Sequence, residues 1–300
     1  MAVGQPAIGE PIRRVCVMKI MDHGAIDETA RGIRDELVGS KLDIREKSAQ
    51  GSTTLATQIA QEFFRQKPIA VIAIGTAAAQ SMISYTRIGK DSLRIIYSAV
   101  TDPHVAGLTE RVNVTGVSDF VPLEPQLRTF LRIQPKLKRL GILYNPKEAN
   151  SVTTVEKLRP LCASAGIDLV ERRISAVAEA PQASVQVAKI VDAIFICNDN
   201  TARFALNSIL AAANARKIPV YASDTEAVSA GALAAMGPNY YEIGKQTGKM
   251  VLRIIDGEST RTIAPEGAGA VELFLNAGVA RHLGITLNKQ LITEAKKVFN

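Results

Sequence analysis

Short apolar runs alternate with amphipathic segments along most of the chain. Six runs rich in valine and isoleucine occupy residues 15–20, 69–74, 94–99, 139–144, 192–197 and 218–223. Their apolar positions are nearly continuous, which is typical of strands that are covered on both faces of a parallel sheet. Weaker strands are predicted at residues 42–47, 113–118, 167–173, 231–236 and 271–276.

Amphipathic helices are predicted between these strands. Residues 25–40 place Ile26, Ile33 and Leu37 on one helical face. Residues 52–66 open with a serine, a residue type preferred at helix N-caps, and a glycine ends the segment 240–257. Since strands and helices alternate, the sequence predicts an α/β fold with right-handed crossovers.

This alternation fits either a TIM barrel of about eight units or two doubly wound lobes of about five strands each. Residues 118–127 interrupt the rhythm with Pro122 and Pro125, which favours a crossover between two lobes. The predicted N-terminal lobe comprises residues 13–120 and 231–260, and the C-terminal lobe comprises residues 121–230 and 261–300. Residues 1–12 are expected to be disordered or to have been added in cloning.

Composition and charge argue against several classes of protein. Hydrophobic residues make up 47% and charged residues 22% of the 300 residues, as in globular domains. The net charge of +7 is spread out and aromatic residues are only 5%, so we expect a solvated basic surface and no nucleic-acid partner. The three cysteines are far apart without a CxxC motif, so neither a metal site nor a disulfide is expected.

No segment predicts a membrane span or a secretory signal. No apolar run approaches the roughly 18 residues that cross a bilayer. The first 14 residues contain no apolar core of the kind found in signal peptides. Read alone, this indicates a cytoplasmic chain, or a mature or recombinant form that lacks its leader.

Motifs of common enzymes are absent. No GxGxxG follows a strand, residues 237–245 have the wrong spacing for a phosphate-binding loop, and neither HExxH nor GxSxG occurs. The three histidines are widely separated, and His23, which ends the first predicted strand, is the one most open to a functional role. We expect no catalytic residue, no metal and no cofactor.

Polar side chains instead gather where the strong strands end. In open α/β sheets ligands bind outside the carboxyl ends of the strands, and helix N-termini there attract carboxylates. Thr76, Ser98 and Thr101 are neutral donors suited to a carboxylate. Asp199 and Asp224 are acids suited to an ammonium group.

Each of these residues has an alternative role as a helix cap. Asp199 or Thr201 could cap the helix that follows them, and Asp224 could cap the next one, because Asp and Thr are preferred N-caps. For one residue alone, a cap and a ligand contact are equally expected, whereas the whole set favours ligand binding. A polar cleft without nucleophile, metal cluster or nucleotide loop indicates recognition without chemistry.

A series of motifs along the chain indicates a resemblance to a known family. They include "DHGAID" (22–27), "IAIGTAAAQS" (72–81), "YSAVTDPHVAGL" (97–108), "GILYNPKEANS" (141–151) and "VYASDTEAVSAGALAAMGPNYYEIGKQTG" (220–248). The chain resembles ABC-transporter substrate-binding proteins of the tryptophan/tyrosine-binding type, which have the type I periplasmic binding protein fold. The resemblance implies two Rossmann-like lobes with parallel sheets, and a cleft that closes by a hinge on an amino acid, aromatic or otherwise hydrophobic. It also implies an ABC permease as partner, a periplasmic or extracytoplasmic location and a monomer.

The resemblance also implies which residues contact the ligand. The carboxylate and part of the ammonium group would be held at Thr76, Ser98, Ala99 and Thr101. The acid that completes the ammonium site would be Asp224 or Asp199. The second-lobe contacts would be Asn145, Asn150, Asp199 and Asn200, and His23 would face the ligand from the first loop.

Two alternatives share this cleft. A ligand-sensing domain of a LacI-type regulator or a sensor has the same fold, but no helix-turn-helix precedes residue 13. An α/β enzyme would draw on His23 with Asp22 and Asp224, but a nucleophile or metal site is lacking. We therefore expect a solute-binding receptor that is not an enzyme.

Overall fold

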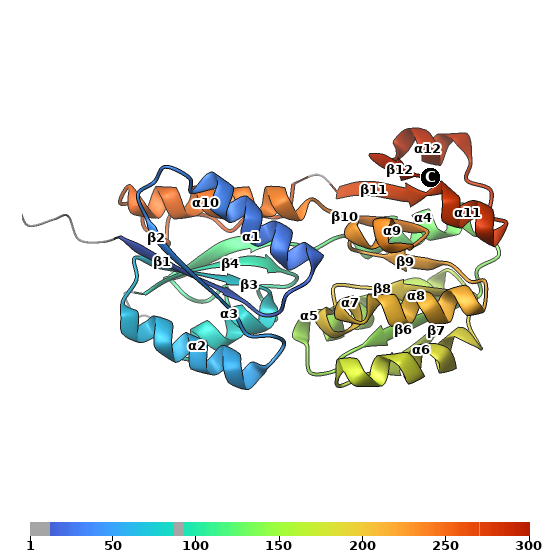
Figure 1. The fold of residues 1–300 in the computed structure, drawn as a ribbon, viewed down its shortest axis with the longest axis horizontal. Helices are drawn as coiled ribbons and strands as arrows, with labels where there is room; N and C mark the ends of the chain where they lie inside the picture. The colour runs from blue at the N-terminus through green and yellow to red at the C-terminus, as the bar shows by residue number, and fades with distance from the viewer. Residues whose placement is uncertain (1–12, 87–92, 270) are drawn as a thin grey trace, which may run out of the picture.

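The computed structural model describes residues 13–86, 93–269 and 271–300. The expectation for residues 1–12 lies outside the described part. Two α/β lobes stand next to each other, with the ends of their sheets facing across the space between them (Figure 1). Within the described residues, none of the helices has the length and apolar character needed to cross a bilayer.

The N-terminal lobe is built on a parallel five-stranded sheet with the order β2-β1-β3-β4-β5. Its strands are β1 (Arg14–Lys19), β2 (Asp43–Ser48), β3 (Ala70–Ile74), β4 (Arg94–Val100) and β5 (Val114–Ser118). Its helices are α1 (Gly24–Glu36), α2 (Thr53–Gln66), α3 (Thr76–Ile83) and α10 (Tyr240–Ile255). Figure 1 shows α1 and α10 on one face of this sheet and α2 and α3 on the other.

The C-terminal lobe is built on a seven-stranded sheet with the order β12-β11-β10-β9-β8-β6-β7. Its strands are β6 (Arg139–Tyr144), β7 (Asp168–Arg173), β8 (Ala193–Ile196), β9 (Val220–Ala222), β10 (Ala234–Pro238), β11 (Val271–Asn276) and β12 (Lys297–Phe299). Its larger helices are α4 (Leu123–Ile133), α5 (Ala149–Ser164), α6 (Ala180–Ala188) and α8 (Leu206–Ala215). Its short helices are α7 (Asn200–Phe204), α9 (Glu226–Ala230), α11 (Ala277–Leu283), α12 (Lys289–Glu294) and the 3₁₀ turn Val177–Glu179.

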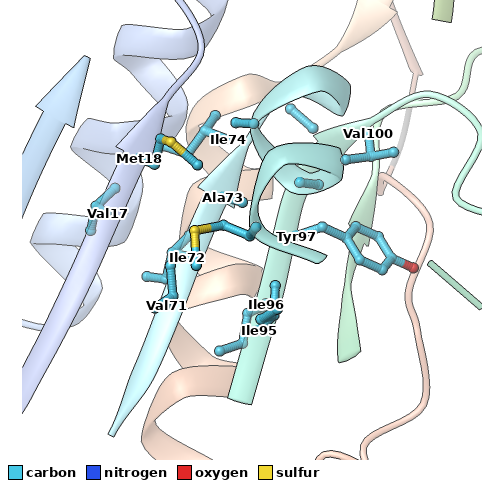
Figure 2. Packing of buried hydrophobic residues seen from close by; sticks show 14 of the residues in the cluster. Val17, Met18, Val71, Ile72, Ala73, Ile74, Ile95, Ile96, Tyr97 and Val100 are labelled. Atoms are coloured by element: carbon cyan, nitrogen blue, oxygen red, sulfur yellow. The ribbon is translucent and has the colours of Figure 1, made fainter. Parts of the chain in front are cut away.

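The strong apolar runs are buried strands, as predicted. All of β3 is buried, and Figure 2 shows Val71, Ile72, Ala73 and Ile74 packed among side chains of β1 and β4. In the C-terminal lobe, successive residues of β8 enter two separate hydrophobic clusters on opposite faces of the sheet. Burial on both faces explains why these runs are continuous instead of alternating.

Two glycines bring α1 and α10 into close contact. A Cβ atom on Gly244 would lie 2.1 Å from the carbonyl oxygen of Thr29, and one on Gly32 would lie 2.1 Å from that of Tyr241. The backbones can therefore approach only because both positions lack a side chain. This packing holds the start of α1, next to His23, close to the start of α10.

The predicted lobe boundaries are wrong in two places. Residues 231–260 were expected in the N-terminal lobe, but β10 pairs with β9 and β11 of the second sheet, so the crossing lies at the start of α10. Residues 261–300 were expected in the C-terminal lobe, but Ile263 packs in the N-terminal core and Glu266 pairs with β5. Strand β12 was not predicted, and β11 runs antiparallel to β10 in an otherwise parallel sheet.

Candidate ligand-binding site

The predicted site residues lie at the strand ends that face each other between the lobes. Thr76 starts α3, and Ser98, Ala99 and Thr101 lie at the end of β4. On the other side, Asn145 follows β6, Asn150 lies in the first turn of α5, Asp199 and Asn200 follow β8, and Asp224 follows β9. Helices α3 and α5 contact each other across the seam. The structure therefore brings the two sets together.

Hydrogen bonds join the two lobes directly. His23 Nε2 lies 3.2 Å from Asn200 Oδ1. Asn198 Nδ2 lies 3.4 Å from the carbonyl oxygen of Asp119 and 3.5 Å from Thr101 Oγ1. His23 and Thr101 of the N-terminal lobe thus contact Asn200 and Asn198 of the C-terminal lobe.

Ser98 and Thr101 already use their hydroxyl groups within the protein. Ser98 Oγ lies 2.7 Å from Thr247 Oγ1 on α10, and Thr247 donates its own proton to the carbonyl oxygen of Ile243. Ser98 Oγ must therefore donate its proton to Thr247 Oγ1. Thr101 Oγ1 donates to Asp119 Oδ1 at 2.8 Å. Neither hydroxyl offers a spare proton to a ligand carboxylate in this arrangement, which differs from the expectation.

Ala99 occupies an irregular position in β4. Its φ is 53°, in the left-handed region that residues with a Cβ atom rarely adopt. The pairing register of β4 with β5 shifts between Ser98 and Val100, so Ala99 forms a β-bulge. Bulges re-aim the chain at sheet ends and near binding sites. Ala99 therefore presents main chain, and not a long side chain, at this end of the strand.

A ring of side chains links the seam to two of the segments that cross between the lobes. Asp119 follows β5, at the first crossover, and Tyr240 begins α10, at the second. Tyr240 Oη donates to Asp119 Oδ2 at 3.1 Å, and Arg203 Nη2 donates to Tyr240 Oη and to Asn198 Oδ1, each at 2.7 Å. Thr101 completes the ring through Asp119 and Asn198.

The charges in this ring are buried. Burial raises the pKa of Asp119, although Arg203 and three hydrogen bonds oppose the rise. Burial alone would lower the pKa of Arg203, but Tyr240, Asp224 and Asp119 outweigh it and raise that pKa. The guanidinium therefore stays charged, and its charge is matched by two nearby acids.

In the C-terminal lobe, Asp199 is a helix cap. Its Oδ1 accepts from Ala202 N and its Oδ2 from Asn145 N, both at 2.6 Å. Burial and then Glu148 raise the pKa of Asp199 to about 7. Of the two roles open for Asp199, the structure therefore selects the cap, with both oxygens already engaged.

Glu148 organises the remaining predicted contacts of this lobe. Its carboxylate accepts from the backbone N–H groups of Asn200 and Thr201, from Asn200 Nδ2 at 2.7 Å and from Thr201 Oγ1 at 2.7 Å. Asn145 Nδ2 and Asn150 Nδ2 also reach it. Asn150 Oδ1 is buried without a partner in the described part of the chain. These amides are oriented before any ligand arrives.

Asp224 forms an ion pair with Arg203 and lies beside a cavity. Its Oδ1 accepts from Glu226 N at 3.0 Å, whereas its Oδ2 lies 3.8 Å from Arg203 Nε, within ion-pair range but without a hydrogen bond from the described residues. A cavity of about 80 Å³, which we call the seam cavity, is lined by residues of both lobes: His23, Gly24, Ile196, Arg203, Leu206, Asp224, Glu226 and Ala227. Burial, followed by the charge of Arg203, lowers the pKa of His23, so this imidazole is neutral near pH 7.

Sequence reasoning missed Arg203, Asp119 and Tyr240 as parts of this site. One signal was available, since Arg203 is the sole charged residue in the stretch 200–215, which is otherwise small, apolar or uncharged. A charge placed inside a buried helical stretch requires a partner. Nothing in the local sequence marked Asp119 or Tyr240, because their roles arise from the crossover geometry.

The described residues include neither a metal-ligand cluster nor an exposed thiol. In the described segments, no group of three or more His, Cys, Asp or Glu side chains is placed to hold a metal ion. The cysteines are buried, and burial raises the pKa of Cys16 and Cys162 to about 11, which leaves them as poorly nucleophilic thiols.

Comparison with known proteins agrees with this geometry. The family of ABC transporter substrate binding proteins matches residues 14–299. A tyrosine-binding protein of Clostridioides difficile is 28% identical over 282 residues, which cover 90% of this chain and 81% of the relative. An ABC domain from Streptococcus pneumoniae in complex with L-Trp is 26% identical, covers 96% of this chain and 100% of its own, and superposes with a TM-score of 0.91.

A third relative shows a different lobe arrangement. The ligand-free, open structure of a substrate-binding protein with adhesive properties from Clostridium difficile is 28% identical and has the same coverage, 96% of this chain and 100% of that one. Its TM-score is only 0.70. At similar identity, the present structure is therefore closer in shape to the tryptophan complex than to the open protein. The predicted two-lobed fold is confirmed, and a TIM barrel is excluded.

Proposed function

Since the chain belongs to the family of ABC transporter substrate-binding proteins, we propose that it is the receptor of an importer for an amino acid, an aromatic one in particular. Members of this family bind a small molecule and work with an ABC permease, so the chain is a binding protein and not an enzyme. We further propose that it acts outside the cytoplasm, as its family does, and as a monomer.

The observation that carries the amino-acid assignment is Asp224 Oδ2, which accepts no hydrogen bond from the described residues and pairs with Arg203 only at 3.8 Å. Asp224 is 7% exposed, faces the seam cavity and keeps Oδ2 outside hydrogen-bond distance of Arg203. A buried carboxylate with spare acceptor capacity is stabilised by a cationic donor such as an ammonium group. The relatives named for tyrosine and bound to tryptophan support an α-amino acid as the source of that group.

The lobe arrangement supports closure around the ligand. The crossovers carry Asp119 and Tyr240, and both are tied to Arg203 of the C-terminal lobe. The likeness to the tryptophan complex is greater than the likeness to the open relative. We infer that the ligand binds an open form and that these contacts assemble as the lobes close, which is a hinge motion typical of such proteins.

Thermal unfolding against the twenty amino acids tests the assignment. A ligand that binds only the folded protein raises Tm by mass action, by about 2.7 kcal/mol of stabilisation at a hundredfold excess over Kd. We expect one or a few aromatic or hydrophobic amino acids to raise Tm, and their des-amino analogues to do so far less. No shift with any amino acid would exclude the amino-acid assignment while leaving the family intact.

A further inference from the structure

The side chain of Arg203 has an unused donor at the seam. This side chain is 7% exposed, and its Nε has no hydrogen-bond partner in the described part of the chain. Arg203 lines the seam cavity together with His23 and Asp224. A buried donor left without a partner costs free energy, so a group that accepts from Nε stabilises the protein when it binds.

The direction of this donor is set by the ring. Arg203 Nη2 donates both to Asn198 Oδ1 and to Tyr240 Oη, and the guanidinium lies 5.3 Å from the centre of the Tyr240 ring. Because the guanidinium is planar, two bonds at Nη2 fix where Nε points. Nε therefore has a fixed direction in this arrangement of the lobes.

His23 and Asp224, which line the same cavity, offer acceptors. Asn200 Nδ2 donates to Glu148, so its Oδ1 must accept from His23 Nε2. His23 is neutral, because burial lowers its pKa, and its proton therefore sits on Nε2. Its Nδ1, which also lacks a partner in the described residues, is then an acceptor, as is Asp224 Oδ2.

One cationic donor and two acceptors match the head of a zwitterion. We propose that Arg203 Nε donates to the carboxylate of an α-amino acid in the seam cavity, while Asp224 Oδ2 and His23 Nδ1 accept from its ammonium group. This placement rests on the proposed function and assigns the carboxylate to Arg203 instead of the hydroxyls of Ser98 and Thr101. The carboxylate then lies next to the buried guanidinium of Arg203 and the ammonium group next to the buried carboxylate of Asp224, so each ionic group of the ligand meets a group of opposite charge.

The seam cavity has room for ligand atoms next to Arg203 and Asp224, since its volume of about 80 Å³ exceeds the ~10–15 Å³ that a single water requires.

Paired ligands with and without the carboxylate test this placement. The probes are L-tryptophan with tryptamine, L-tyrosine with tyramine, and L-phenylalanine with phenethylamine, titrated by calorimetry. In Arg203→Met the affinity for the amino acid is expected to fall about 10- to 100-fold, as for a lost charged hydrogen bond, while the affinity for the amine changes less than about threefold. Arg253→Met, an exposed residue of α10 that pairs with Glu258, is the matched control and should change neither.

An equal loss for both members of a pair would mean that Arg203 acts only through the hinge, and the carboxylate assignment would be overturned. If the wild-type protein binds none of the three amino acids, the aromatic assignment of the proposed function fails with it. Should Arg203→Met not fold, the crystal structure of the wild-type protein with its amino acid decides. A carboxylate oxygen within about 3.2 Å of Arg203 Nε supports the proposal, and a carboxylate bound elsewhere overturns it.

Discussion

The carboxyl ends of β8 and β9 lie next to each other in the second sheet, and each is followed by a buried aspartate. Asp199, after β8, accepts two backbone N–H groups with its two oxygens. Asp224, after β9, accepts one backbone N–H group and keeps its other oxygen beside the seam cavity. The same residue type therefore holds a helix in one loop and is left available for a ligand in the other.

The neighbours of each acid explain this difference. Glu148, the residue before α5, reaches the loop after β8. Together with Asp199 it accepts from the first three backbone N–H groups of α7. In the loop after β9, Asp224 Oδ2 accepts no hydrogen bond from the nearest cation, because Arg203 directs Nη2 toward Tyr240 and Asn198. A buried acid becomes a binding group when its surroundings leave one lone pair unmatched.

The largest expected effect is on stability at the β8 end. Asp199→Ala removes a cap and leaves the backbone N–H of Asn145 without a partner, so the free energy of unfolding should fall by about 2–4 kcal/mol. Urea unfolding measures this loss. A loss below about 1 kcal/mol would show that Asp199 is not the structural acid of the pair.

The next effect is on affinity at the β9 end. Asp224→Asn should weaken an amino acid by about 10- to 100-fold and its des-amino analogue by less than about threefold, because only the ammonium contact loses its charge. The free energy of unfolding should also fall, because the buried guanidinium of Arg203 loses one of the two acids that match its charge, although the amide oxygen still accepts from Glu226 N. Asp168→Asn, at the exposed start of β7, is the control. Equal weakening of both ligands would contradict the ammonium role.

The pH dependence of stability sharpens the same comparison. Burial and Glu148 raise the pKa of Asp199 from 3.8 to about 7, so the folded protein holds this proton more tightly than the unfolded chain does. The stabilisation is complete below about pH 4 and is lost as the pH rises through about 7. The free energy of unfolding of the wild-type protein minus that of Asp199→Asn should therefore fall across this window. A difference that stays flat or rises with pH would contradict the raised pKa.

The smallest expected effect is at Ser98. Like Asp199, this residue already forms its hydrogen bonds within the protein. Ser98→Ala removes the hydrogen bond between β4 and Thr247 on α10 and should cost about 1 kcal/mol of stability. Affinity for the amino acid should stay within about twofold in the same titration. A tenfold loss of affinity without a loss of stability would return Ser98 to the ligand contacts.

Much of the fold could be predicted from the order of apolar runs. Continuous runs such as residues 69–74 are strands because both faces of a parallel sheet are covered, and this leaves a direct trace in the sequence. The short β12 left no such trace because it is three residues long and partly exposed. The boundary error at β10 arose because an apolar strand carries no mark of which sheet it joins.

The sequence by itself determined which residue types gather at the strand ends, since hydrogen-bonding side chains follow buried strands at known positions. Thr76, Asn150 and Asp224 could be selected in this way, whereas Ala99 was selected only through the family resemblance. Whether a given oxygen or proton is already used depends on neighbours distant in the chain, as with Ser98 and Thr247. Only the tertiary structure, which links Arg203 through Tyr240 to Asp119, decided which of these groups remain available to a ligand.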